Sequence, residues 1–366
     1  MGKIKLRDLN DRVLSIRDLK IEFDTNNKTL KAIRGIDFDL FKNETVALVG
    51  ESGSGKSVTM KAIMGIMAKN GKITDGFIKY WDKEDNNKLY EITQMNNTQI
   101  RKYISGKKIA MIFQDPMTSL DPTMKVGKQI RETILFHRKG VSKKEAKELS
   151  IKYLADVGIN NPEIVYDQYP NQLSGGMRQR VVIAIALSCQ PQILICDEPT
   201  TALDVTVQDK ILNLIKDLQV KNQLSVIYIT HDLGVVAKVA DYVAVMYAGK
   251  IVEKGSVEEI FYDPRHPYTW GLLSSMPDLD TEEGTLHPIP GTPADLLKPI
   301  KGDAFAPRNP YALNIDYKEC PPQFNVGGKH RVSSWLLDER APQVSMPENL
   351  RTRIDKMRKA VGIDEL

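Results

Sequence analysis

Cysteine is scarce in this sequence, which holds three in 366 residues, at Cys189, Cys196 and Cys320. They lie far apart and form no C-x-x-C pair. Because a disulfide framework or a cysteine-ligated zinc site needs several grouped thiols, the cysteine count argues against both. The cysteine usage favours a reducing compartment such as the cytosol.

Long hydrophobic runs are also missing, since none approaches the ~18 apolar residues that a membrane-crossing helix requires. Val181–Leu187 (VVIAIAL) is among the longest, and it has the length of a core segment. The N-terminus, MGKIKLRDLNDR, lacks the apolar stretch of a signal peptide. We therefore expect any role at a membrane to act through a partner that spans it.

Neither sign of charge dominates, because 51 Lys and Arg residues are offset by 47 Asp and Glu residues, for a net charge of +4. A nucleic-acid-binding protein usually concentrates basic residues on one face, and this balance gives no such indication. The hydrophobic fraction of 42% is typical of a globular protein. The length exceeds one ordinary domain, which predicts a main domain with an appendage.

The first part of the chain carries the periodicities of a mixed sheet. Val13–Phe23 and Leu30–Leu40 alternate loosely and predict antiparallel strands. Val46–Val49 is a short apolar run before glycines, which predicts a buried parallel strand. The predicted elements that follow are a helix at Lys56–Met67 and a strand pair at Ile73–Trp81 and Leu89–Ile92.

Between Met117 and Gln172 the sequence becomes charged, and two segments with helical spacing predict an inserted helical subdomain, at about residues 115–172. Strand and helix patterns alternate again after it, so we expect an α/β fold with a mostly parallel, helix-covered sheet. The predicted helices are Lys125–Arg138, Lys143–Val157, Val181–Leu187 and Val207–Leu218. The predicted strands are Ile193–Cys196, Ser225–Thr230 and a final hairpin of Tyr242–Met246 and Lys250–Glu253.

Proline becomes frequent after Asp263. We expect residues 264–366 to form a loosely structured C-terminal extension with short strands and a terminal helix at Glu348–Val361. The predicted division is therefore a main domain at 1–263 and an extension at 264–366.

Residues Gly50 to Ser57 read GESGSGKS and fit the phosphate-loop pattern G-x-x-x-x-G-K-[ST]. Small residues let backbone N–H groups wrap a phosphate chain, and the following helix directs its N-terminus at the anion. Lys56 would supply a positive charge to the β- and γ-phosphates, and Ser57 a hydroxyl to Mg²⁺. A chance match is a weak alternative, because the motif follows an apolar strand and opens an apolar-striped helix.

The apolar strand at Ile193–Cys196 ends in two carboxylates, Asp197 and Glu198. A buried strand would deliver Asp197 to the Mg²⁺ side of a nucleotide site. Glu198 could then polarise a water molecule for attack on the γ-phosphate. Two solvated acids at a strand end are the ordinary alternative, and the phosphate loop makes the catalytic interpretation the stronger one.

Residues Leu173 to Met177 read LSGGM, so Ser174, Gly175 and Gly176 would open a helix as a second anion-binding cap. A plain helix start is the alternative for this segment alone. The chain resembles the ABC (ATP-binding cassette) ATPase family over about residues 13–260, on motifs in the family's order: the phosphate loop, Gln114, LSGGM, Asp197-Glu198, Ala202-Leu203-Asp204 and His231.

This resemblance implies a P-loop NTPase core and a head-to-tail dimer, with ATP between the phosphate loop of one subunit and the Ser-Gly-Gly cap of the other. It implies Glu198 as the catalytic base, His231 as a contact to the γ-phosphate, Gln114 as a sensor that reaches Mg²⁺, and Asp204 as an organiser of the dimer interface. Phe23 would stack on adenine, although a plain core phenylalanine is the alternative. The nucleotide-binding positions of the loop would be Gly50, Ser52, Gly53, Gly55, Lys56, Ser57 and Val58.

Two further segments, Met117–Ile130 and Arg265–Leu273, resemble the oligopeptide and dipeptide importers of this family, as do Met177 and the long C-terminal extension. Residues 301–311 resemble a tail motif that carries iron–sulfur cysteines in many relatives. The matching positions here hold Asp303, Asn309, Asp316 and Ser334. Because such a cluster needs several cysteine ligands, we expect no iron–sulfur cluster.

The resemblance implies two transmembrane permease subunits, a second homologous ATPase in a heterodimer, and an extracellular peptide-binding protein as partners, with no nucleic acid. The chain would lie at the cytoplasmic face of the cell membrane, and its helical subdomain would receive the permeases. The same ATPase role for dipeptides, nickel or another substrate is one alternative. A soluble ABC ATPase acting on DNA or ribosomes is another, as is a non-hydrolysing partner, against which Glu198 and His231 argue.

Overall fold

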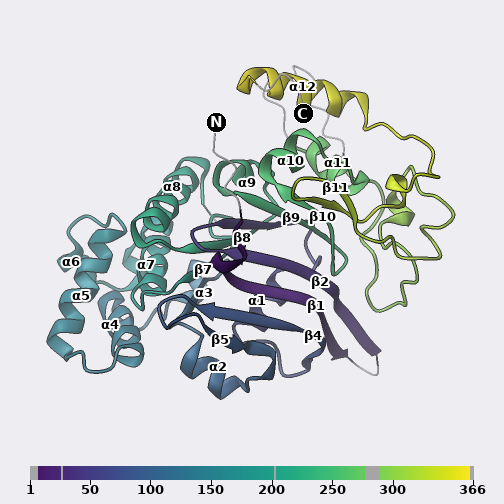
Figure 1. The fold of residues 1–366 in the computed structure, drawn as a ribbon. Helices are drawn as coiled ribbons and strands as arrows, with labels where there is room; N and C mark the ends of the chain where they lie inside the picture. The colour runs from purple at the N-terminus through teal and green to yellow at the C-terminus, as the bar shows by residue number, and fades with distance from the viewer. Residues whose placement is uncertain (1–6, 26–27, 202, 277–287, 363–366) are drawn as a thin grey trace.

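The computed structural model describes residues 7–25, 28–201, 203–276 and 288–362. Two sheets lie at the centre of this part, with helices around them (Figure 1). The strands are β1 (Arg12–Thr25), β2 (Lys28–Phe41), β3 (Thr45–Val49), β4 (Gly71–Asp82), β5 (Lys88–Glu91), β6 (Ile109–Ile112), β7 (Ile193–Asp197), β8 (Ser225–Thr230), β9 (Tyr242–Tyr247), β10 (Lys250–Ser256), β11 (Phe324–Gly327) and β12 (His330–Val332).

The helices divide into those that cover the sheets, those that form a separate lobe and those of the C-terminal part. They are α1 (Lys56–Ile63), α2 (Asn97–Tyr103), α3 (Pro116–Ser119), α4 (Val126–His137), α5 (Lys143–Asp156), α6 (Pro162–Tyr166), α7 (Gly175–Leu187), α8 (Val205–Asn222), α9 (Leu233–Val239), α10 (Val257–Tyr262), α11 (Pro267–Ser274) and α12 (Glu348–Val361). Among the described residues, none of these helices combines the length and the apolar character needed to cross a bilayer.

The smaller sheet is antiparallel and has the order β2-β1-β4-β5. Its strands β1, β2 and β4 present alternate apolar side chains, such as Ile16, Ile36 and Ile78, to one hydrophobic core. Burial of every second side chain on one face is what loose alternation in a sequence produces. The predicted antiparallel strands at Val13–Phe23, Leu30–Leu40 and Ile73–Trp81 are confirmed.

The larger sheet has the order β11-β12-β10-β9-β3-β8-β7-β6 in the described chain. Strands β9, β3, β8, β7 and β6 run parallel, and β10, β12 and β11 add to one edge in antiparallel fashion. All residues of β3, β7, β8 and β9 are buried, because α7, α8 and α9 cover one face of the parallel part, and α1 with the smaller sheet covers the other. The prediction of a mostly parallel, helix-covered sheet is confirmed.

Helices α4, α5 and α6 form a lobe beside the sheets, seen at the left of Figure 1. Their apolar stripes, which include Ile130, Ile134 and Leu154, pack together and against α7. The predicted helices at Lys125–Arg138 and Lys143–Val157 are confirmed to within a residue at each end.

Two expectations need correction. The helix after the phosphate loop ends at Ile63 rather than at Met67, because Gly65 adopts a left-handed conformation (φ +63°) that stops it. The C-terminal part is also less loose than expected: β12 pairs with β10 through Glu253 and Val332, and the predicted terminal helix at Glu348–Val361 packs on α10 and α11.

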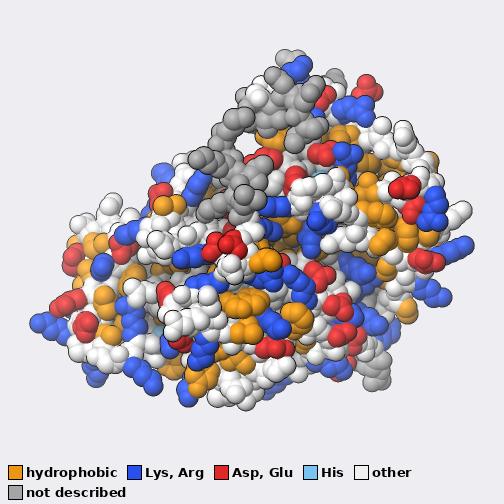
Figure 2. All heavy atoms as spheres, viewed as in Figure 1, with side chains coloured by type: hydrophobic (Ala, Val, Ile, Leu, Met, Phe, Trp, Pro, Cys, Tyr) orange, Lys and Arg blue, Asp and Glu red, His pale blue; other side chains and the backbone are white. Residues whose placement is uncertain are grey.

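The face of the molecule seen in Figure 2 mixes both signs of charge. Lys and Arg side chains are interspersed with Asp and Glu side chains over the sheets and the helical lobe, without a broad area of one sign. This arrangement follows from the near balance of acidic and basic residues in the sequence.

Candidate functional site

Four neighbouring parallel strands, in the order β3-β8-β7-β6, deliver the candidate residues to one edge of the larger sheet. The phosphate loop follows β3, His231 follows β8, Glu198 follows β7, and Gln114 comes shortly after β6. Parallel strands end at the same edge, where open α/β sheets bind their ligands. The predicted site residues therefore meet because of the sheet order, although they are far apart in the sequence.

Gly50, Gly53 and Gly55 of the phosphate loop all have a positive φ, and at Gly50 and Gly55 a side chain would also collide with its surroundings. Gly50 has φ +151° and Gly55 has φ +106°, which side-chain-bearing residues rarely adopt. A Cβ on Gly50 would lie 2.1 Å from the carbonyl oxygen of Met246, and one on Gly55 would lie 2.5 Å from Cδ1 of Ile33. The loop therefore packs its backbone tightly against β9 and β2, which leaves its other side open to a ligand.

Lys56 lies inside this loop with its side chain folded back on the backbone. Its ammonium group donates to the carbonyl oxygens of Gly50 (2.7 Å) and Glu51 (2.9 Å) and to Oγ of Ser54 (3.4 Å). Lys56 is buried, and this burial lowers its pKa although the nearby Glu198 opposes the effect. A phosphate anion in the loop would give this cation a stronger partner than the neutral carbonyls do.

Ser57 and Asp197 form the pair of oxygen ligands that the sequence predicts for Mg²⁺. Oγ of Ser57 donates to Oδ1 of Asp197 over 2.9 Å. Burial raises the pKa of the Asp197 carboxyl, and the charge of the adjacent Glu198 raises it further. A hydroxyl and a carboxylate suit Mg²⁺, which prefers oxygen ligands, and a cation here would offset the burial of Asp197. The two side chains therefore fit the metal that the family implies.

Glu198 has an unusual backbone and a crowded carboxylate. Its φ of +47° is left-handed, and its N–H donates to the carbonyl of Ile229 in β8 (2.9 Å). Such a conformation costs roughly 1–3 kcal/mol in a non-glycine residue and is found mostly at functional sites. The carboxylate contacts Nε2 of Gln114 (2.8 Å), Nδ1 of His231 (3.0 Å) and Oγ1 of Thr201 (3.1 Å). The three predicted catalytic residues are thus in direct contact.

These residues surround a cleft of about 630 Å³. It is lined by Phe23, Leu30, Ala32, Ser52, Gly53, Gly55, Lys56, Ser57, Val58, Gln114, Glu198, Thr201, His231 and Leu296. The partly buried Phe23 packs on the core of the smaller sheet and also lines the cleft, and its stacking on adenine stays a prediction. Sequence analysis missed Leu30, Ala32, Thr201 and Leu296, none of which belongs to a motif with a chemical signature.

The structure does not bring Ser174, Gly175, Gly176 or Asp204 to this cleft. Ser174 and Asp204 are the N-caps of α7 and α8, where their side chains accept from the N–H groups of Met177 (3.3 Å) and Val207 (2.9 Å). The helix starts lie together, since a Cβ on Gly176 would come within 2.8 Å of Val207. They form a second surface of the chain, apart from its own phosphate loop. Ala202 lies outside the described residues.

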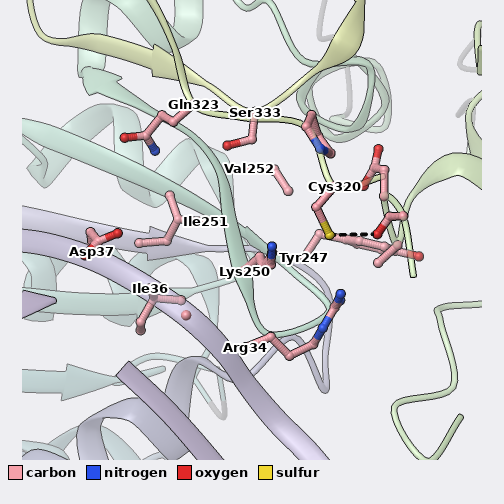
Figure 3. Close-up of a pocket in the computed structure, with 15 residues that line it drawn as sticks. Arg34, Ile36, Asp37, Tyr247, Lys250, Ile251, Val252, Cys320, Gln323 and Ser333 are labelled. Carbon is pink, nitrogen blue, oxygen red and sulfur yellow. Dashed lines mark hydrogen bonds between the residues drawn. The ribbon is translucent and has the colours of Figure 1, made fainter. Parts of the chain in front are cut away.

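The four positions that the sequence analysis matched to a cysteine-bearing tail motif close turns of the backbone. The side chains of Asp303, Asn309, Asp316 and Ser334 accept from the N–H groups of Phe305 (3.0 Å), Tyr311 (3.0 Å), Leu313 (2.6 Å) and Leu336 (3.3 Å). Cys320 faces a separate cavity of about 180 Å³ between the extension and strands β2 and β10 (Figure 3). Its thiol donates to the carbonyl of Gly302 (3.1 Å), so it acts as a local hydrogen-bond donor.

Comparison with known proteins matches two families. The family described as ABC transporter matches residues 33–201, and the oligopeptide/dipeptide transporter C-terminal region matches residues 252–315. The chain is 52% identical over 354 residues to the oligopeptide transport ATP-binding protein AmiE of Streptococcus pneumoniae, covering 97% of this chain and 98% of AmiE. It is 55% identical over 348 residues to OppD of Bacillus subtilis, an oligopeptide transport ATP-binding protein, covering 94% and 95%.

The fold also resembles solved ATP-binding cassettes. A dimeric, post-hydrolysis structure of the cassette MJ0796, bound to ADP and Pi, matches with a TM-score of 0.58 at 24% identity, over 67% of this chain and 98% of that one. The structure of cbiO1 from Clostridium perfringens, part of an ABC transporter complex, matches with a TM-score of 0.57 at 27% identity, over 69% and 92%. The predicted fold class is confirmed by these similarities.

Proposed function

Because the chain belongs to the ATP-binding subunits of oligopeptide and dipeptide ABC transporters, we propose that it hydrolyses Mg-ATP to power the uptake of oligopeptides. It is an ATPase subunit of an ABC importer, it works with membrane permeases, and it is associated with the membrane. The observation that carries the proposal is the contact of Gln114 and His231 with Glu198 beside a phosphate loop.

In this proposal the phosphate loop grips the triphosphate of ATP. Lys56 exchanges its carbonyl partners for phosphate oxygens, and the loop N–H groups and the start of α1 provide further hydrogen bonds. Ser57 and Asp197 would hold Mg²⁺, which neutralises phosphate charge when bound. Phe23 and Val58 would contact the nucleotide from the wall of the cleft.

Glu198 would act as the general base. A carboxylate offers about four hydrogen-bond acceptor sites, and the contacts with Gln114, His231 and Thr201 use three of them, which leaves one for a water molecule. Gln114 and His231 would fix the orientation of the carboxylate and extend toward the γ-phosphate. The left-handed backbone of Glu198 sets the direction of its side chain before any substrate arrives.

A second ATPase chain would complete the site. The cap formed by Ser174, Gly175 and Gly176 has the N–H groups of a helix start but lies outside the chain's own cleft. A head-to-tail dimer would place it over the phosphates bound by a partner, with Asp204 at the interface. We propose a heterodimer with a homologous ATPase, on the resemblance to the oligopeptide importers.

The remaining parts of the proposal concern the assembly. The cassette at residues 1–263 would lie at the cytoplasmic face of the membrane, and its helical subdomain, at about 115–172, would receive two permease subunits. An extracellular peptide-binding protein would supply the cargo, and nucleic acid would not take part. Uptake of dipeptides or nickel, or a role as a soluble ABC ATPase, is the alternative.

The test is a reconstitution of the chain with a sibling ATPase, two permeases and a peptide-binding protein. We expect ATP-dependent uptake of oligopeptides by proteoliposomes, abolished by Lys56→Ala in this chain. Competing uptake of dipeptides and of Ni²⁺ would identify the cargo. A chain that fails to join permeases but binds nucleic acid, or uptake that persists with Lys56→Ala, would refute the proposal.

A further inference from the structure

The second residue of the phosphate loop, Glu51, is held by the C-terminal extension. Its carboxylate forms a two-point ion pair with Arg308, with nitrogen–oxygen distances of 2.6 and 2.9 Å. Its N–H donates to the hydroxyl oxygen of Tyr268 in α11 over 2.8 Å. Its carbonyl oxygen accepts from Lys56. One residue thus connects the extension to the cation that the loop uses for phosphate.

Burial and contacts other than the one to Glu51 hold the Arg308 side chain in place. Its side chain is 4% exposed. Its Nε donates to the carbonyl of Pro290 (2.8 Å), and its guanidinium lies 5.7 Å from the ring centre of Tyr247 and 6.0 Å from that of Phe305. A guanidinium held in this way presents a rigid pair of donors, which matches a carboxylate better than a flexible ammonium would.

The pair has an electrostatic consequence inside the loop. A carboxylate in a loop that surrounds a polyanion opposes binding of that polyanion unless a cation neutralises it. The carbonyl oxygen of Glu51 accepts from the Lys56 ammonium over 2.9 Å, so Glu51 lies beside the group that would contact phosphate. Arg308 cancels this charge and directs the carboxylate toward the extension.

We propose that Arg308 is a positioning residue for nucleotide binding, which neutralises Glu51 and holds the phosphate loop in its binding shape. The extension thereby sets the affinity of the cassette for Mg-ATP. An ion pair that only attached the extension to the cassette could use any two residues where they meet. This pair instead uses a residue of the phosphate loop, and Leu296 of the extension also lines the nucleotide cleft. The inference rests on the proposed role of that loop.

The test measures the dissociation constant of Mg-ATP for the full-length chain by calorimetry. Arg308→Met leaves Glu51 unneutralised, and we expect it to weaken binding about tenfold. Glu51→Gln removes the charge but also the ion pair, so it should weaken binding less than Arg308→Met does. The double variant should regain most of the affinity that Arg308→Met loses, because no unpaired carboxylate remains. In the assembled transporter, Arg308→Met should raise KM for ATP while kcat changes little.

The matched control is Arg340→Met, which breaks a two-point ion pair with Asp338 that is also in the extension but does not touch the loop. We expect unchanged binding from it. Thermal melting checks folding, and Arg308→Gln carries the same test if Arg308→Met does not fold. Equal affinity of Arg308→Met and the original chain, or a double variant as weak as Arg308→Met, would overturn the inference. Lys56→Ala separates the two ideas: if it still binds Mg-ATP normally, the proposed role of the loop fails as well.

Discussion

At the scale of single residues, the site depends on a strained glutamate whose neighbours come from two other strands, β6 and β8. Glu198 keeps a left-handed backbone because its N–H is bonded to β8 and its carboxylate to Gln114 and His231. Surrounding contacts of this kind are what allow a strained conformation to persist. The carboxylate is therefore oriented before substrate binds, as a general base requires.

Glu198→Gln should lower the ATPase rate of the assembled transporter at least about 100-fold, since an amide cannot accept the proton of water. Mg-ATP affinity should stay the same or rise, because a negative charge beside the phosphates is removed. Steady-state hydrolysis and ATP retention on the purified complex measure the two effects. Glu84→Gln, which changes an acid that does not line the cleft, is the control and should hydrolyse normally. Unchanged turnover in Glu198→Gln would remove Glu198 from the role of base.

At the scale of elements, the sequence predicted the strands and helices that have a local signature. The sequence predicted β3, β7 and β8 from their apolar runs and α4 and α5 from their helical spacing. In each case the pattern of apolar residues is visible within a short segment of the sequence. Strand β6, with four residues, was missed because so short a run does not distinguish a strand from a helix.

The candidate site also contains residues that the sequence predicted and residues that it did not. The phosphate loop and the strand-end carboxylates were predicted because their motifs carry the chemistry, and Gln114 and His231 were predicted from the resemblance to the ABC ATPase family. The contacts of Arg308, Tyr268 and Leu296 with the loop and its cleft were not. Arg308 lies 257 residues from Glu51 along the chain, and no local pattern marks such a pair. Only the docking of the extension on the sheet brings these groups together.

Helix α11 gives a prediction about pH, because its N-cap is the buried His266. Nδ1 of His266 accepts from the N–H of Tyr268 (3.0 Å), so this nitrogen carries no proton in the folded chain. Burial lowers the pKa of His266 from its ordinary 6.5, although Asp303, Glu253 and Asp316 oppose the effect. Protonation would remove the cap and leave a buried charge.

The folded chain therefore binds fewer protons at His266 than the unfolded chain does. The stability contributed by neutral His266 is fully present above about pH 6.5 and is lost as the pH falls below it, by up to about 1.4 kcal/mol per pH unit. His266→Asn keeps a capping oxygen but does not titrate, so its melting temperature should fall less between pH 7.5 and 5.5. Thermal melts at both pH values measure the difference. An identical fall in both chains would contradict the role of His266.

At the scale of the whole molecule, the chain holds two surfaces that we propose bind phosphate, and only one of them lines the cleft. The phosphate loop lies at the carboxyl edge of the larger sheet, and the cap at Ser174–Gly176 lies at the start of α7, outside the cleft. Each surface has unsatisfied helix N–H groups that suit phosphate oxygens. In a head-to-tail dimer, each nucleotide would lie between the phosphate loop of one chain and the cap of the other. ATP would therefore contribute to the contact between the subunits.

Gly175 allows this arrangement to be tested without disturbing the fold. A Cβ at Gly175 would meet only Cδ2 of Leu203, at an ordinary 3.6 Å, and its φ lies outside the range that favours glycine. Gly175→Asp adds a negative charge that suits the N-terminus of α7, so the chain should remain folded. Its own Mg-ATP affinity should stay within about twofold, because its phosphate loop is untouched.

The same charge would repel the triphosphate bound by a partner chain. We expect Gly175→Asp to abolish ATP-dependent association with the sibling ATPase and to lower hydrolysis by the assembled transporter by at least about half, since one of the two sites is spoiled. Gly175→Ala, which adds only the methyl group, should retain most of both. Analytical ultracentrifugation with and without Mg-ATP reports association. If Gly175→Asp weakened ATP binding by the isolated chain and left the pair intact, the cap would serve its own subunit rather than its neighbour.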